Sequence, residues 1–150
     1  MALYLDTEFN GFKGELISLA LFNVDGNHFY EVLELPADYC VHPWVKANVV
    51  PVLNKKWCTS MFLRHSLINY LNNQNHDNLI YADWPEDFIH LLNQLYEHDG
   101  RKLIESLKLE LITIPDKICE PSKIPHNALS DAEALRKNHL KMMYSSKLYA

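Results

Sequence analysis

The chain has 150 residues, of which 48% are hydrophobic and 22% charged, as expected for one compact globular domain spanning residues 1–150. Its 4 glycines and 7 prolines exclude collagen-like and low-complexity proteins, and no apolar run approaches the roughly 20 residues of a membrane span. The formal net charge of −5 weighs against a protein that holds nucleic acid through basic side chains alone.

Three cysteines, Cys40, Cys58 and Cys119, are present, and none forms a Cys-x-x-Cys pair. This pattern indicates reduced thiols rather than a disulfide framework or a cysteine-rich zinc site. The first residues have no basic region and include an acid at position 6, unlike a secretory signal. We therefore expect a cytoplasmic protein with no membrane partner.

Hydrophobic periodicity predicts strands and helices in the order βββαβαβα. Strands are expected at residues 2–9, 15–24, 28–36, 78–84 and 109–114, with a tight turn at residues 25–27. Helices are expected at residues 42–50, from a cap at 59 or 60 to the polar residues 72–75, from 85 to near 99–100, and at 128–143. This order predicts an α/β fold with a mixed five-stranded sheet covered by helices, and it resembles the ribonuclease H-like arrangement.

Asp6 and Glu8 lie at the end of the first predicted strand. Because side chains two residues apart on a strand share a face, both carboxylates project together and repel each other. A divalent cation between them would relieve this repulsion. The alternative is a solvated strand end, but the preceding apolar residues favour a buried strand whose polar end reaches the edge of a sheet.

Asp83 ends the fourth predicted strand, and Asp87 lies in the first turn of the helix that follows. Both could be metal ligands. Asp87 also has a structural explanation, because an acid in the first turn interacts favourably with the helix dipole. Asp83 could instead cap the helix ahead of a proline. The residues alone do not separate these roles.

His126 precedes Asp131 by five residues, and Asp131 falls in the first turns of the last predicted helix. The two side chains could converge on one site from a loop and a helix. The alternatives are a histidine on a surface loop and an acid at a helix start.

Together the acids form three motifs in chain order: Asp-x-Glu, a single Asp, and His-x4-Asp. This set resembles the DEDDh group of 3′-to-5′ exonucleases in the ribonuclease H-like superfamily. The linking segments are similar to the small bacterial and phage exoribonucleases related to the polyadenylate-specific 3′-exoribonuclease of mycobacteria. The matching segments are Asp6-Thr7-Glu8-Phe9, Glu15-Leu16-Ile17-Ser18 and Trp44–Leu53.

The second motif departs from the family pattern. The usual motif has a Gly-His-Asn segment ahead of its Phe-Asp, whereas this chain has Ala-Asp-Trp-Pro-Glu-Asp at residues 82–87. Leu91 follows Asp87 by four residues, as a leucine follows the family's aspartate. The resemblance therefore favours Asp87 as the ligand, with Asp83 as the alternative.

The resemblance implies hydrolysis of single-stranded RNA from its 3′ end to nucleoside 5′-monophosphates, with two divalent cations, Mg²⁺ or Mn²⁺. It implies that Asp6 bridges the cations, that Glu8 and Asp131 hold the one beside the nucleophile, and that Asp87 reaches the other through water. His126 would take the proton of the attacking water, as an imidazole can near neutral pH.

Substrate contacts are expected from Thr7 and from Phe9, which is the aromatic residue nearest the acids. Other candidates for stacking on bases are Phe12, Trp44, Trp57 and Trp84. The glycine-containing segment 10–14 would let backbone amides approach the terminal sugar. The basic C-terminal residues 137–150, with Leu148 and Tyr149, could form a homodimer surface or pack on their own domain.

The expected partner is the 3′ end of a single-stranded nucleic acid, with RNA favoured over DNA. A single-stranded DNA exonuclease, a catalytically silent ribonuclease H-like binding module and a phosphatase with an aspartate nucleophile are the alternatives. The phosphatase usually has Asp-x-Asp, and Glu8 stands where its second aspartate would be. The charge of −5 does not exclude a nuclease, because two divalent ions would nearly cancel it.

Overall fold

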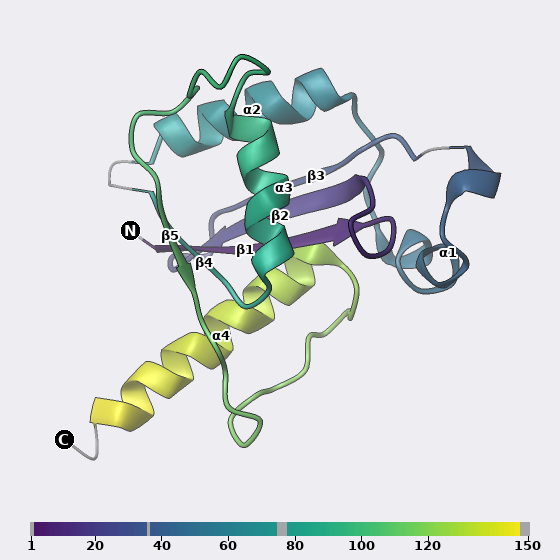
Figure 1. The fold of residues 1–150 in the computed structure, drawn as a ribbon. Helices are drawn as coiled ribbons and strands as arrows, with labels where there is room; N and C mark the ends of the chain where they lie inside the picture. Colours follow the sequence, from purple (N-terminus) through teal and green to yellow (C-terminus); the bar gives the residue numbers. More distant parts are fainter. Residues whose placement is uncertain (1, 36, 75–77, 148–150) are drawn as a thin grey trace.

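A computed structural model of the chain describes residues 2–35, 37–74 and 78–147. It has an α/β fold in which helices cover both faces of a mixed five-stranded sheet (Figure 1). The strands are β1 (Ala2–Phe9), β2 (Leu16–Asn23), β3 (His28–Val32), β4 (Leu79–Ala82) and β5 (Lys108–Leu111). The helices are α1 (Pro43–Asn48), α2 (Ser60–Asn72), α3 (Pro85–Leu95) and α4 (Ala128–Lys147), with 3₁₀ turns at Asp38–Cys40 and Val50–Val52.

The strand order is β3-β2-β1-β4-β5, so β1 lies at the centre of the sheet. β1 and β3 are antiparallel to β2, whereas β4 is parallel to β1 and β5 is parallel to β4. The predicted turn between β2 and β3 is confirmed: the side-chain oxygen of Asn23 accepts hydrogen bonds from the N–H groups of Asp25 and Asn27, both 2.9 Å. Gly26 has a φ of +91°, which glycine adopts without strain.

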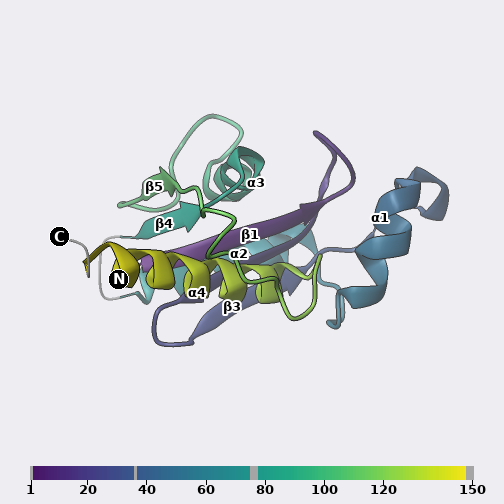
Figure 2. The same ribbon diagram turned by 90° about the horizontal axis from the view of Figure 1, so that it is seen from below.

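Two apolar layers hold the helices on the sheet. α2 and α3 contribute buried leucines to one layer, whereas residues of α1 and α4 belong to the other. Seen from below, α4 lies in front of the sheet and α2 behind it (Figure 2). Consecutive β2 residues belong to different layers, because Leu19 packs toward α2 and α3 while Ala20 packs toward α4. Side chains alternate between faces along a strand, so an interior strand buried on both sides must be almost wholly apolar.

Several predicted boundaries differ from those in the structure. α3 ends at Leu95 rather than near residue 99, because Tyr96 is extended and forms a bridge with Lys102 across a turn that contains Gly100. β3 ends at Val32, after which Leu33 pairs with Cys58. β5 is shorter than predicted, and α4 continues to Lys147. Leu148 and Tyr149, invoked for a dimer surface, lie outside the described residues.

Within the described ranges, no helix is both long and apolar enough to cross a membrane.

Asn127 fixes the start of α4 against the rest of the fold. Its side-chain oxygen accepts a hydrogen bond from the N–H of Ser130 at 3.1 Å, which is the geometry of a helix cap. Its buried amide nitrogen donates to the carbonyl of Val52 at 2.7 Å and lies 3.3 Å from the hydroxyl of Tyr30. The tyrosine hydroxyl in turn donates to the carbonyl of Leu53 at 2.7 Å. One side chain therefore sets the position of the loop and helix that carry the third motif.

We expect Asn127→Ala to lower the free energy of unfolding by about 2–4 kcal/mol, because it removes a cap and leaves the carbonyl of Val52 without its donor. Urea denaturation followed by circular dichroism would measure the loss. Asn48→Ala is the matched control: Asn48 is exposed and makes one hydrogen bond, to the carbonyl of Trp44. Its loss should stay within about 0.5 kcal/mol, and equal losses for the two variants would contradict the role given to Asn127.

Candidate metal centre

The C-terminal end of β1 carries two of the three closest carboxylates. Asp6 and Glu8 project from one face of this strand, as predicted, and Asp131 reaches them from the first turn of α4. Each of these three residues offers a carboxylate oxygen within 4.8 Å of the others, so one cation could contact all three. The strand register shifts between Glu8 and Phe9, so the regular pairing with β2 ends where the acids end.

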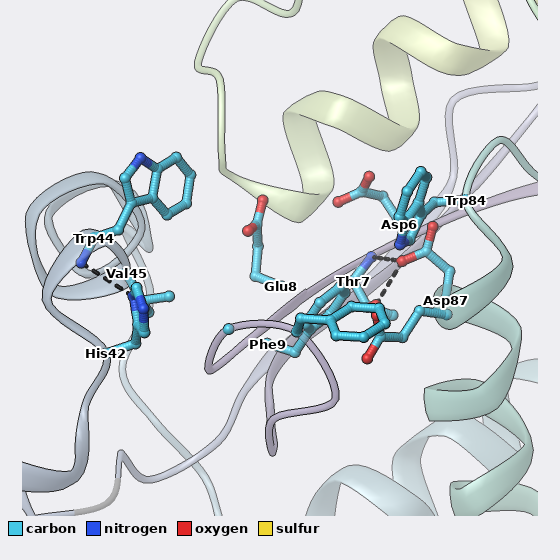
Figure 3. A pocket seen from close by; sticks show the side chains of 12 residues that line it. Asp6, Thr7, Glu8, Phe9, His42, Trp44, Val45, Trp84 and Asp87 are labelled. Carbon is cyan, nitrogen blue, oxygen red and sulfur yellow. Dashed lines mark hydrogen bonds between the residues drawn. The ribbon is translucent and has the colours of Figure 1, made fainter.

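Asp87 approaches Asp6 from the first turn of α3 (Figure 3). One of its oxygens, Oδ1, accepts hydrogen bonds from the backbone N–H of Thr7 at 3.1 Å and from the Thr7 hydroxyl at 2.6 Å. The other, Oδ2, is buried and has no hydrogen-bond partner among the described residues, although only 2% of Asp87 is exposed. The hydroxyl and the backbone N–H of Thr7 therefore both orient the carboxylate of Asp87.

Asp83 has different surroundings. Its side chain is exposed, and it lines a cavity of about 470 Å³ between the segment after β5 and α4, together with Asp6 and Asp131. The suggestion that Asp83 caps α3 is wrong, because Trp84 occupies the N-cap position and Pro85 the first helical position. Asp83 and Asp87 thus line two different cavities, each of which includes Asp6. Of these two aspartates, only Asp87 has a buried oxygen without a hydrogen-bond partner among the described residues.

His126 adopts a φ of +65°, which is uncommon for a residue other than glycine. Its backbone N–H donates to Oδ2 of Asp131 at 2.9 Å, so the main chain holds the acid in place. The imidazole ring lies edge-on to the ring of Trp44, with centroids 4.9 Å apart. His126 and Asp131 are therefore brought together from a loop and a helix, as predicted, through the backbone of the histidine.

Burial and mutual repulsion raise the pKa values of these acids. Desolvation is the main cause at Asp6, whose pKa is raised well above its ordinary value, with further increases from Asp87, Glu8 and Asp131. Burial, followed by the charges of Asp131 and Asp87, raises the pKa of Glu8 to about 8. Burial raises the pKa of Asp87 to about 7, although the hydroxyl of Thr7 opposes the change. Burial also raises the pKa of Asp131.

Aromatic side chains surround a second cavity beside the acids, of about 440 Å³. Phe9 stacks on His90 with ring centroids 4.9 Å apart, which fixes its ring in the cavity wall. Phe12 is 77% exposed, and Trp44 and Trp84 are about half exposed around the same cavity. Figure 3 shows Trp44 and Trp84 on opposite sides of it. The cavity also contains Asp6, Glu8 and Asp87, whereas the predicted candidate Trp57 does not line it.

The loop after β1 differs from its predicted role. Gly14 has no room for a side chain, because a Cβ would lie 2.1 Å from the carbonyl oxygen of Asn10. The backbone N–H groups of Asn10, Gly11, Lys13 and Gly14 all donate to oxygens of the chain itself. The expectation that the amides of this segment approach a terminal sugar is therefore wrong for these four residues.

Two buried polar residues of α3 were missed by the sequence analysis. Glu86 accepts a hydrogen bond from the backbone N–H of Lys13 at 2.7 Å, and His90 supports Phe9. Acids in the first turn of a helix normally face water, so the sequence pattern gave Glu86 no special role. The only sequence feature that distinguished Glu86 was its difference from the family pattern, in which a phenylalanine stands immediately before the aspartate of the second motif.

The chemistry of the donor set fits a hard divalent cation. All four central ligand candidates are carboxylates, which favour Mg²⁺ or Mn²⁺ over softer metals. Oδ2 of Asp6 and Oδ2 of Asp87 are both buried without a hydrogen-bond partner among the described residues. Buried charges are costly unless they are paired or coordinate a metal, and bound cations would satisfy both oxygens.

No protein-family model matches the chain, and no curated protein matches it in sequence. The case for a function therefore depends on the residues of the site.

We expect the metal-free protein to lose stability as the pH rises. Asp6, Glu8 and Asp87 bind protons more tightly in the folded state than in the unfolded chain, so folding is favoured at low pH. For Glu8, this contribution is complete below pH 4.5 and is lost as the pH rises through about 8. Mg²⁺ or Mn²⁺ should restore the stability, most strongly at the upper end of this window, because cations then bind deprotonated acids.

Thermal melting in chelator and in excess cation, from pH 5 to pH 9, would measure both effects. Asp6→Asn should flatten the pH dependence in chelator and abolish most of the stabilisation by cations. A wild-type melting temperature that is constant or rises over this range in chelator would contradict the expectation that protonation of these acids stabilises the folded state.

Thr7→Val should weaken cation binding or activity by about 10–100-fold, because it removes the hydroxyl that orients Asp87. Thr7→Ser keeps the hydroxyl and should stay close to the wild type. Titration with Mn²⁺, followed by the change in melting temperature, would compare the variants. Equal binding by Thr7→Val and Thr7→Ser would contradict the positioning role of the hydroxyl.

Proposed function

We propose that this protein is a metal-dependent 3′-to-5′ exoribonuclease of the DEDDh type, which releases nucleoside 5′-monophosphates from single-stranded RNA. The observation that carries the proposal is the convergence of carboxylates from β1, α3 and α4 beside a cavity with aromatic walls. The sheet order, three antiparallel strands followed by two parallel ones, is compatible with the ribonuclease H-like fold that such a nuclease would have.

Two cations would be held by the acids at the end of β1. Asp6, Glu8 and Asp131 would hold one, and Asp6 with Asp87 would hold the other. When bound, such cations activate a water molecule and stabilise the attacking and leaving oxygens of a phosphodiester. The chain itself supplies the oxygen ligands, holds Asp87 through Thr7, and holds Asp131 through the backbone N–H of His126.

His126 is the proposed proton acceptor. Its backbone makes the hydrogen bond to Asp131, so neither ring nitrogen is needed to hold the loop. The ring packs against Trp44, which lines the aromatic cavity, and so lies at the border between the acids and the proposed substrate. A general base in this position typically contributes about 10²–10⁴-fold to the rate.

The shape and charge of the site favour a single-stranded end. Aromatic side chains stack on unpaired bases of any sequence, and Phe12, Trp44 and Trp84 expose rings around the cavity. The chain carries a net charge of −5, which disfavours binding of a long duplex through basic side chains alone. Cys40, Cys58 and Cys119 are free thiols, which suits the reducing cytoplasm proposed as the location of this nuclease.

We expect wild-type protein to shorten a 5′-labelled single-stranded RNA from its 3′ end in Mg²⁺ or Mn²⁺ and to be inactive in excess chelator. A matched DNA strand should be shortened more slowly. Gel electrophoresis of a time course, with chromatography of the mononucleotide product, would measure both reactions. Full activity in chelator, or release of inorganic phosphate alone, would contradict the proposal. Faster cleavage of DNA than of RNA would show that the protein is an exodeoxyribonuclease instead.

Asp6→Asn should abolish the cleavage. His126→Ala and His126→Gly should both slow it by about 10²–10⁴-fold, since each removes the proton acceptor. The glycine variant relieves the positive φ, so its stability separates backbone strain from chemistry. Normal activity of either His126 variant would rule out the histidine as the base.

A further inference from the structure

Glu86 is a buried acid that lines the aromatic cavity and has one oxygen without a hydrogen-bond partner among the described residues. It is the second residue of α3 and is only 8% exposed. One oxygen, Oε1, accepts a hydrogen bond from the backbone N–H of Lys13 at 2.7 Å. The other, Oε2, is buried without a hydrogen-bond partner among the described residues, and Glu86 lines the cavity that contains Asp6 and Asp87.

An unpaired oxygen in this position is a cost to the folded protein. Burial of a carboxyl oxygen without a donor is unfavourable, and a hydrogen-bonding ligand would recover that cost on binding. The hydrogen bond to Lys13 accounts for one oxygen only, and His90, one turn further along α3, also has an unpartnered ring nitrogen, Nε2. The unused acceptor therefore indicates that the ligand of this cavity carries a donor.

Glu86 is linked both to the proposed metal acids and to the aromatic walls, and it lines the same cavity as both. On one side it is followed in the chain by Asp87, which Thr7 holds beside Asp6. On the other side it holds Lys13, the residue next to the exposed ring of Phe12. In a nucleotide, the sugar lies between the phosphate and the base. With a phosphate at the acids and a base at the aromatic rings, the sugar would lie at Glu86.

We propose that Oε2 of Glu86 accepts a hydrogen bond from a ribose hydroxyl of the 3′-terminal nucleotide, which rests on the proposed nuclease function. A carboxylate only accepts hydrogen bonds, so it selects donors, and the phosphate has none to offer. The terminal ribose of RNA presents its 2′- and 3′-hydroxyls, and the 2′-hydroxyl is the group that distinguishes RNA from DNA. Most amides of the loop at residues 10–14 are already used, so Glu86 takes the sugar-reading role first expected of that loop.

Binding of uncharged nucleosides to metal-free protein tests this inference without the cations. Adenosine, 2′-deoxyadenosine and 3′-deoxyadenosine would be titrated in chelator to millimolar concentration, followed by tryptophan fluorescence, to which Trp44 and Trp84 of the cavity contribute, and by nuclear magnetic resonance. We expect adenosine to bind about tenfold more tightly than at least one of the deoxynucleosides, as for loss of a hydrogen bond to a charged group. Weaker binding of the 2′-deoxynucleoside indicates selection for RNA, and weaker binding of the 3′-deoxynucleoside indicates recognition of a free 3′ end.

Glu86→Met has a side chain of similar length without the carboxylate and should bring the three affinities within about twofold of one another. Glu86→Gln keeps an oxygen for the N–H of Lys13 and should reduce the difference. Glu133→Gln is the matched control: this acid lies on α4, pairs with Lys137 at 2.6 Å and does not line the aromatic cavity. It should keep the wild-type preference.

Equal binding of the three nucleosides by wild-type protein, or no binding of adenosine, would overturn the inference without any variant. An unchanged preference in a folded Glu86→Met protein would overturn it as well. The proposed nuclease function fails separately, if wild-type protein with Mg²⁺ or Mn²⁺ cleaves neither RNA nor DNA.

Discussion

The repulsion between carboxylates gathered at the end of β1 is the constraint on which the rest of the site depends. The pKa of Asp6 is raised well above its ordinary value, because its carboxylate is desolvated and is repelled by acids from α3, α4 and its own strand. Hydrogen bonds from the rest of the fold hold these acids together. The backbone and hydroxyl of Thr7 hold Asp87, and the backbone of His126 holds Asp131. A protein with no use for this cluster would be more stable with neutral residues there.

Much of the fold and part of the site could be predicted from the sequence because they depend on local rules. Alternation along a strand placed Asp6 and Glu8 on one face, and helical periodicity placed Asp131 at the start of α4. The end of α3 could not be predicted, since the extended Tyr96 depends on pairing with Lys102. The burial of Glu86 could not be predicted either. It depends on how the loop that carries Lys13 folds against α3, which no local rule gives.

The site has two sides that meet at Asp6. One cavity has aromatic walls and includes Asp87, and the other lies along α4 and includes Asp83. The structure gives each aspartate of the second motif a distinct environment, which the spacing of the residues alone could not do. The buried oxygen of Asp87 suits a ligand with fixed geometry, whereas Asp83 is an exposed residue, although partial burial still raises the pKa of its carboxyl group. Among the described residues, Asp6 alone borders both cavities, which suits the bridging role implied by the resemblance.

The parallel pairing of β1 with β4 and the packing of α4 on β1 have a consequence for biosynthesis. Contacts between residues so far apart in the chain form slowly, because a large loop must close first. During translation Asp6 leaves the ribosome early and Asp131 more than a hundred residues later. Until α4 has emerged and docked, the chain lacks its third close carboxylate. A nascent chain from which α4 has not yet emerged would therefore carry an incomplete cluster of carboxylates.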